Sequence, residues 1–243
     1  RSLNVAEEFR LYLKRLLLIP VHALERFMAT RRIQRGAFPY HLALLQLEHD
    51  ASFRAHGPFA AQSEFLECVI DGFARGAPPH HHLVFKAHPL EDGRAPVPAD
   101  IKRLARSYGI AERVHFVRGG KLARLLDNAR TATTVNSTAA QQALWRGIPL
   151  RAFGIAIYGK PELVSDQPLA EFYADPKAPD RKAYRDFRDF LLATSQLPGS
   201  FYAGKGRRQL LRQVPDMMLA QRDPYAIARP QSEALRQQFR LVE

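Results

Sequence analysis

The stretch Leu83-Val84-Phe85-Lys86-Ala87-His88-Pro89 is a short apolar run that ends in a lysine, a histidine and a proline. A run of this length, bounded by turn residues, is typical of a strand buried in a parallel sheet. Similar runs recur on both sides of it, separated by amphipathic stretches, which is the pattern of repeated strand–helix–strand units. The sequence predicts strands over residues 41–47, 82–86, 113–117, 132–135 and 150–153, and helices over residues 62–75, 99–108, 122–128 and 138–145.

The predicted fold class is therefore α/β, with a parallel Rossmann-like sheet flanked by helices and helical extensions at both ends. Residues 1–39 are expected to form a helical segment, in which a helix over residues 6–32 is kinked or divided by Pro20. Residues 40–160 form the Rossmann-like, ligand-binding domain. Residues 161–243 form a helical extension that packs on this lobe.

Charge and composition narrow the classes of partner. Lys and Arg outnumber Asp and Glu by 36 to 24, so the net charge of +12 attracts anions such as a sugar nucleotide, an acidic lipid surface or nucleic acid. The basic residues are scattered and form no recognisable nucleic-acid-binding motif, so nucleic acid is not the expected partner. Residues 1–10 carry no secretory signal, and the uncharged run 16–24 is shorter than the roughly 20 residues of a membrane span. We expect a cytoplasmic protein whose first helix lies on a bilayer or on another domain.

Ligands of such sheets bind beyond the carboxyl ends of the strands, and two loops there suit a phosphate. In the first loop, Lys86 and His88 can make charge-assisted hydrogen bonds, with Pro89 setting the turn. In the second, Asn136 or Ser137 is expected to cap a helix that starts near residue 138, and the free N–H groups of such a helix bind phosphate. Together the two loops favour a nucleotide ligand.

The stretch Leu44-Leu45-Gln46-Leu47-Glu48-His49-Asp50 places two carboxylates and an imidazole at the same edge. A carboxylate here can act as a base or as a nucleophile on the anomeric carbon of a sugar. The three histidines at 80–82 have no carboxylate or cysteine at the spacing of metal ligands, so we expect no metal site.

These segments resemble, in order, the capsular polysaccharide biosynthesis and export family, whose members transfer 3-deoxy-manno-octulosonic acid (Kdo) in the β configuration. The resemblance covers about residues 40–203. It rests on the two stretches quoted above and on His56-Gly57-Pro58-Phe59, Arg113-Val114-His115-Phe116-Val117, Thr134-Val135-Asn136-Ser137-Thr138, Gly154-Ile155-Ala156-Ile157-Tyr158 and Ser195-Gln196-Leu197-Pro198-Gly199-Ser200-Phe201-Tyr202.

The resemblance implies one lobe of a GT-B glycosyltransferase that takes Kdo from CMP-Kdo with retention of configuration and needs no further cofactor. The implied acceptor is an anionic, phosphatidylglycerol-type lipid at the inner membrane surface, and the implied location is cytoplasmic and peripheral to that membrane. Other capsule assembly proteins are implied as further partners. Asp50 would be the catalytic carboxylate, and the implied nucleotide-binding residues are Lys86, His88, Pro89, Asn136, Ser137 and Thr138.

Two departures from the family pattern bear on these expectations. Residues 139–142 read Ala-Ala-Gln-Gln where the family commonly has a glycine, which would tighten the space near the ligand. Only about 39 residues precede the first predicted strand, so we expect a fragment or a short form without the other lobe. A non-catalytic capsule export or assembly subunit and a basic nucleic-acid-binding module are the alternative hypotheses.

Overall fold

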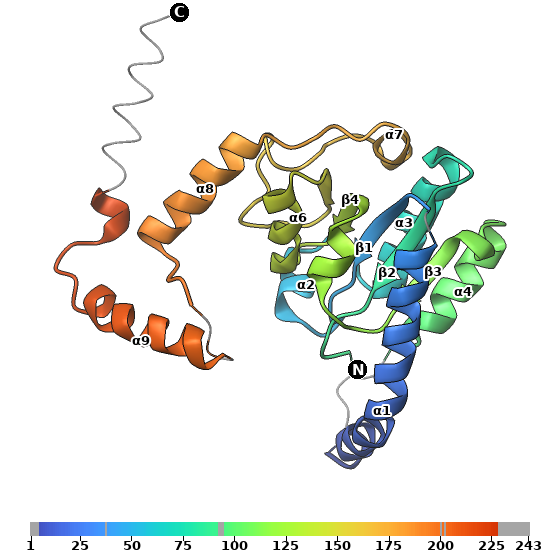
Figure 1. The fold of residues 1–243 in the computed structure, drawn as a ribbon, viewed down its shortest axis with the longest axis horizontal. Helices are drawn as coiled ribbons and strands as arrows, with labels where there is room; N and C mark the ends of the chain where they lie inside the picture. Colours follow the sequence, from blue (N-terminus) through green and yellow to red (C-terminus); the bar gives the residue numbers. More distant parts are fainter. Residues whose placement is uncertain (1–4, 37, 92–94, 200, 202, 228–243) are drawn as a thin grey trace, which may run out of the picture. The chain divides into compact units, whose positions relative to one another are not determined.

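The computed structural model describes residues 5–36, 38–91, 95–199, 201 and 203–227 (Figure 1). The chain divides into two compact units, residues 1–181 and residues 182–243. The elements that begin in the first unit are α1 (Val5–Arg35), β1 (Tyr40–Leu44), α2 (Ala51–His56), α3 (Gln62–Gly76), β2 (His82–Lys86), α4 (Val97–Ser107), β3 (Val114–Val117), α5 (Leu122–Leu126), β4 (Ala129–Thr134), α6 (Gln141–Arg146), β5 (Leu150–Ala152), α7 (Leu169–Ala174) and α8 (Arg181–Thr194).

The five strands form one parallel sheet in the order β3-β2-β1-β4-β5. Leu42 in the central strand lies opposite Val84 on one side and Ala132 on the other. The predicted parallel, Rossmann-like sheet flanked by helices is thereby confirmed. The strand order reverses at β1, so the topological switch point lies between the carboxyl ends of β1 and β4, where doubly wound folds bind ligands.

Several predicted boundaries need correction. β1 ends at Leu44 instead of residue 47, and β4 begins at Ala129 instead of residue 132. The predicted helix over residues 138–145 is a 3₁₀ turn, Thr138–Ala140, followed by α6. Pro20 does not divide the first helix, because α1 continues across it. The short helices α2 and α7 were not predicted.

The main core lies between the sheet and the layer formed by α3, α4 and α7, and Figure 1 shows α3 and α4 side by side on this face. It contains Phe65 and Phe73 of α3, Leu104 of α4, and Phe172 and Tyr173 of α7, all buried. The spacing of Phe65, Val69 and Phe73 places these residues on one side of α3, as the amphipathic pattern predicts. This core fixes the strands whose carboxyl ends carry the candidate site.

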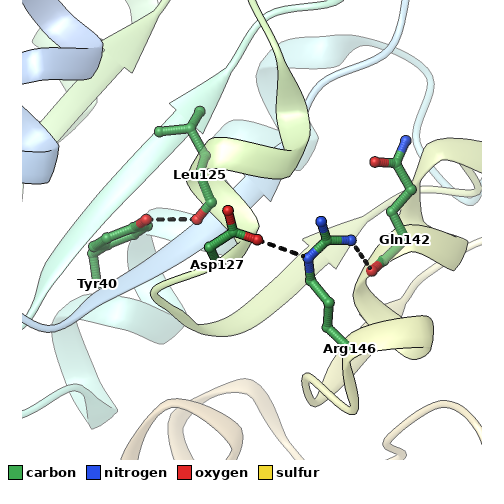
Figure 2. Close-up of polar contacts among 5 residues, drawn as sticks. All are labelled: Tyr40, Leu125, Asp127, Gln142 and Arg146. Atoms are coloured by element: carbon green, nitrogen blue, oxygen red, sulfur yellow. Dashed lines mark hydrogen bonds and ion pairs between the residues drawn. The ribbon is translucent and has the colours of Figure 1, made fainter.

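A polar path joins the start of β1 to the helices on either side of β4 (Figure 2). The hydroxyl of Tyr40 donates to the carbonyl oxygen of Leu125 over 2.5 Å, and Asp127, the C-cap of α5, pairs with Arg146 of α6 at 3.1 Å. Arg146 also donates to the carbonyl oxygen of Gln142. These contacts tie α5 to the start of β1 and to α6.

Helix α1 packs its carboxyl-terminal half beside β3, with Ile33 buried and Glu25 paired with Arg118 at 3.6 Å. In the described part of the chain, none of the helices has the length and apolar character that crossing a bilayer requires. α1 nevertheless carries many large apolar side chains that are exposed. They are Phe9, Tyr12, Leu13, Leu16, Leu17, Ile19, Val21, Leu24, Phe27 and Met28.

The second unit contains all but the first residue of α8, together with α9 (Gly204–Met218). Tyr184 and Leu191 of α8 and Leu210 of α9 are buried, and the rings of Phe190 and Tyr225 meet edge to face at 5.7 Å. Lys182 and Asp186 form an exposed pair one turn apart on α8.

Candidate functional site

The candidate site is the carboxyl edge of the three central strands, where β2, β1 and β4 are neighbours in the sheet. Because parallel strands end at the same edge, the loops after Lys86, after Leu44 and after Thr134 lie next to one another. All of the predicted site residues belong to these loops or to the strand ends that lead into them.

Lys86 is the last residue of β2, and only 6% of it is exposed. Its ammonium donates a hydrogen bond of 3.3 Å to the carbonyl oxygen of Ala87, and in the described part of the chain it forms no ion pair. Burial lowers the pKa of Lys86, with no carboxylate opposing the shift. A buried cation without a counter-charge is costly, so an anion bound at this point would stabilise it.

His88 is half-buried two residues further on, and Pro89 follows it as an exposed residue. Burial is the main cause of the lowered pKa of His88, followed by the charge of Lys86, while Asp50 and Glu91 oppose the shift. The imidazole is therefore neutral at pH 7. Because Nδ1 accepts a hydrogen bond from the backbone N–H of Leu90 at 3.2 Å, the ring proton resides on Nε2, which can donate to a ligand oxygen.

The turn after β4 is capped by Ser137, one of the two predicted cap residues. Its hydroxyl accepts from the backbone N–H of Ala139 at 3.3 Å, and its carbonyl oxygen accepts from the hydroxyl of Tyr158 at 2.6 Å. The backbone N–H of Ser137 donates to the hydroxyl of Thr134. Three hydrogen bonds of Ser137 thus hold the turn. Thr138, the first residue of the 3₁₀ turn, is exposed.

Asn136 is 4% exposed, and both polar atoms of its side-chain amide are engaged within the protein. Its Oδ1 accepts from the amide of Gln46 at 2.7 Å, and its Nδ2 donates to the carbonyl oxygen of Ser52 at 2.8 Å. Its backbone N–H donates to Oε1 of Gln46 at 2.9 Å. Sequence reasoning placed Gln46 at this edge but missed the pairing, which spans 90 positions of the chain.

The two carboxylates after β1 have different environments. Glu48 accepts a hydrogen bond of 3.0 Å from the backbone N–H of Gln62 and so caps the start of α3. Asp50 is exposed and is the N-cap of α2, where its Oδ1 accepts from the backbone N–H of Ser52 at 3.0 Å. Its charge acts on the pKa of His88, so the carboxylate and the imidazole are within electrostatic reach.

The opposite, amino edge of the sheet contains paired histidines. His41 is fully buried and bonds to the hydroxyl of Thr131 at 2.9 Å and to His81 at 3.0 Å. His82 bonds to His115 at 2.8 Å. Among the described residues, no group of three or more histidine, cysteine or carboxylate side chains is arranged to hold a metal ion.

Comparisons with known proteins give a consistent assignment. The model of the family described as capsule polysaccharide biosynthesis protein matches residues 1–202. The capsule polysaccharide export protein KpsS of Escherichia coli is 34% identical over 163 residues, which are 67% of this chain and 42% of that protein. The capsule polysaccharide modification protein LipB of Neisseria meningitidis is 29% identical over 182 residues, 74% of this chain and 43% of that protein. The chain thus matches less than half the length of these relatives.

Among solved structures, Thermosulfurimonas dismutans KpsC, a β-Kdo 2,7 transferase, aligns with a TM-score of 0.41 and 17% identity. This alignment covers 73% of this chain and 67% of that chain.

Proposed function

The chain belongs to the capsule polysaccharide biosynthesis protein family, and on that premise we propose that it is the donor-binding lobe of a GT-B glycosyltransferase. In this proposal the donor is CMP-Kdo, and the β-Kdo group passes to a phosphatidylglycerol-type lipid. Lys86, His88 and Pro89 on one loop and Ser137 and Thr138 on the other contact the CMP group.

The buried, unpaired ammonium of Lys86 is the observation that carries the proposal. In the described part of the chain it has one hydrogen bond of 3.3 Å and no ion pair. The phosphate of a sugar nucleotide supplies the missing charge, and hydrogen bonds between ionised groups are about twice as strong as neutral ones. The Nε2–H of His88 adds a neutral donor to the same phosphate.

Asp50 is the candidate nucleophile, because it is exposed and within electrostatic reach of His88. Its carboxylate attacks the anomeric carbon of Kdo while the bond from that carbon to the phosphate oxygen breaks, and CMP leaves with the electron pair. The acceptor hydroxyl then loses its proton to a base and displaces Asp50 from the same carbon. Two displacements give net retention of configuration. Lys86 stabilises the negative charge that develops on the departing phosphate.

The exposed apolar side chains of α1 and the net charge of +12 support an acceptor that resides in an anionic membrane. Exposed apolar side chains can enter a bilayer interface, and anionic lipids attract basic residues. In this proposal, α1 brings the site to the membrane surface.

CMP binding by the purified chain tests the proposal. Calorimetry should detect CMP binding by the wild type, and His88→Ala should weaken it at least tenfold, because a hydrogen bond to the phosphate is lost. His80→Ala is the matched control, since His80 is exposed at the amino edge and lies outside the site. Wild-type protein that binds none of CMP, CDP or UDP would refute the donor-binding role.

A non-catalytic capsule assembly protein is the second candidate, because capping α2 is by itself a structural role for Asp50. Asp50→Asn separates the two functions, since asparagine caps a helix as well as aspartate but is not a nucleophile. The enzyme hypothesis expects this variant to bind CMP normally and to fail to restore capsule in a deletion strain. Full restoration of capsule would favour the assembly role.

A further inference from the structure

A continuous path of hydrogen bonds runs from the turn after β4 to the carboxylate of Asp50. Gln46, two residues after the end of β1, holds Asn136 by two hydrogen bonds of 2.7 and 2.9 Å. Asn136 in turn donates to the carbonyl oxygen of Ser52, and the backbone N–H of Ser52 donates to Asp50. The path crosses from β4 to the first turn of α2 at the switch point of the sheet.

Helix α2 depends on contacts of this kind for its position. It has only six residues, and helices shorter than about 12 residues are marginal without tertiary contacts. Asn136 holds its first turn. The loop after β5 holds its last turn, because the backbone N–H of Ile155 donates to the carbonyl oxygen of His56 at 2.7 Å.

Gly154 makes this close packing possible. A Cβ atom at residue 154 would lie 2.4 Å from the carbonyl oxygen of His56 and 3.2 Å from Nδ2 of Asn136. Any larger residue would therefore clash with the end of α2 and crowd the amide of Asn136. The loop after β5 and the side chain of Asn136 thus pack against α2 together.

We propose that Gln46 and Asn136 are positioning residues that hold Asp50 in place relative to the nucleotide-binding turn, and that Asn136 does not contact the nucleotide. Gln46 is 7% exposed and Asn136 is 4% exposed; their side-chain amides bond to each other, and the amide of Asn136 also bonds to Ser52. This assignment rests on the proposed function, and it replaces direct nucleotide binding as the role of Asn136.

The turn keeps two hydrogen bonds of Ser137 when this path is broken. Ser137 remains bonded to Tyr158 through its carbonyl oxygen and to Thr134 through its backbone N–H. Lys86 and His88 belong to another loop and are not part of the path. The loss of Asn136 should therefore displace α2 and Asp50 and leave CMP binding largely intact, whereas the loss of a direct ligand would weaken CMP binding.

Hydrogen exchange and CMP affinity, measured on Gln46→Leu, Asn136→Leu and the double variant, test the proposal. Exchange of the backbone amides of residues 52–57 should accelerate at least tenfold in each single variant, while the Kd for CMP changes less than threefold. The double variant should lose less stability than the sum of the singles, because it removes both partners of the bond between the two side-chain amides, whereas each single variant leaves one amide without its partner. In the transfer assay, kcat should fall at least tenfold with little change in KM.

Tyr40→Phe is the matched structural control, because it breaks a buried hydrogen bond at the amino edge of β1, away from α2. It should lower stability without changing exchange in residues 52–57 or kcat. Unchanged exchange in Asn136→Leu, an unchanged kcat, or a Kd for CMP raised tenfold or more would each overturn the positioning role. Wild-type protein that binds no CMP would refute the proposed function alone, since the exchange measurement requires no ligand.

Discussion

Replacing Lys86 with methionine should stabilise the ligand-free protein and weaken CMP binding at the same time. Lys86 is 6% exposed, and its ammonium has one hydrogen bond of 3.3 Å to Ala87. Exchange of buried ionic groups for apolar ones of similar volume is neutral or stabilising by about 1–4 kcal/mol. Methionine matches the length of the buried stem, so we expect the free energy of unfolding to rise by about 1–3 kcal/mol. At roughly 2–4 °C per kcal/mol, the Tm should rise by about 2–12 °C.

The effect on affinity follows from the lost charge. A hydrogen bond to a charged group contributes about 1.5–3 kcal/mol, which corresponds to an increase of about 10- to 150-fold in the Kd for CMP. Thermal unfolding and titration calorimetry measure both quantities on the same sample. Lys102→Met on the exposed face of α4 is the control, and it should change neither quantity. A Lys86→Met variant that loses stability and retains its affinity for CMP would refute the reasoning.

Three further predictions concern the stability of the fold. Burial lowers the pKa of His41 in the folded protein to about 3. As the pH falls below about 6.5, the imidazole of His41 is protonated in the unfolded chain but not in the folded one. The free energy of unfolding should therefore fall by up to about 1.4 kcal/mol per pH unit. Urea unfolding between pH 7.5 and 4.5 should therefore show a shallower loss for His41→Gln than for wild type, and equal slopes would contradict this. Gly154→Ala should destabilise the protein by about 1–3 kcal/mol through the clash with His56, whereas Gly204→Ala, with open space around it, should not. Tyr40→Phe should lower the free energy of unfolding by about 1–3 kcal/mol in chemical denaturation, because the carbonyl oxygen of Leu125 loses its partner. A change within about ±0.5 kcal/mol, as for neutral surface substitutions, would argue against that bond.

The central strands β1 and β2 were predictable because they are largely buried on both faces and therefore appear as apolar runs between turn residues. The boundaries that failed are those where side chains from other strands decide the structure. β4 starts earlier than predicted, at Ala129, because the register shifts between Tyr40 and His41, and the polar Thr131 is satisfied by His41 across the sheet. Helix α2 is too short to show a helical period, and Asp50 as an N-cap was its one local signal.

The sequence indicated which edge of the sheet carries the candidate site, but not which residues contact one another there. The strand ends indicated the loops that contain Lys86 and Ser137, because parallel strands end together. The pairing of Gln46 with Asn136 depends on β1 and β4 being neighbours, and strand order is not encoded in any local stretch of sequence. The separate roles of Glu48 and Asp50 likewise depend on which helix each residue caps.

Lys86 at the carboxyl edge differs from Tyr40 and His41 at the amino edge in how its buried polar group is satisfied, and this difference favours anion binding at the carboxyl edge. At the amino edge, His41 bonds to both Thr131 and His81, and Tyr40 bonds to Leu125, so these groups contribute to stability without a ligand. At the carboxyl edge, the ammonium of Lys86 is buried with one long hydrogen bond. Desolvating a cation in this way costs stability in the free protein, and a bound anion offsets the cost. The buried ammonium of Lys86 should therefore make the free protein less stable and the binding of a phosphate stronger. Measurements on Lys86→Met test the two effects together.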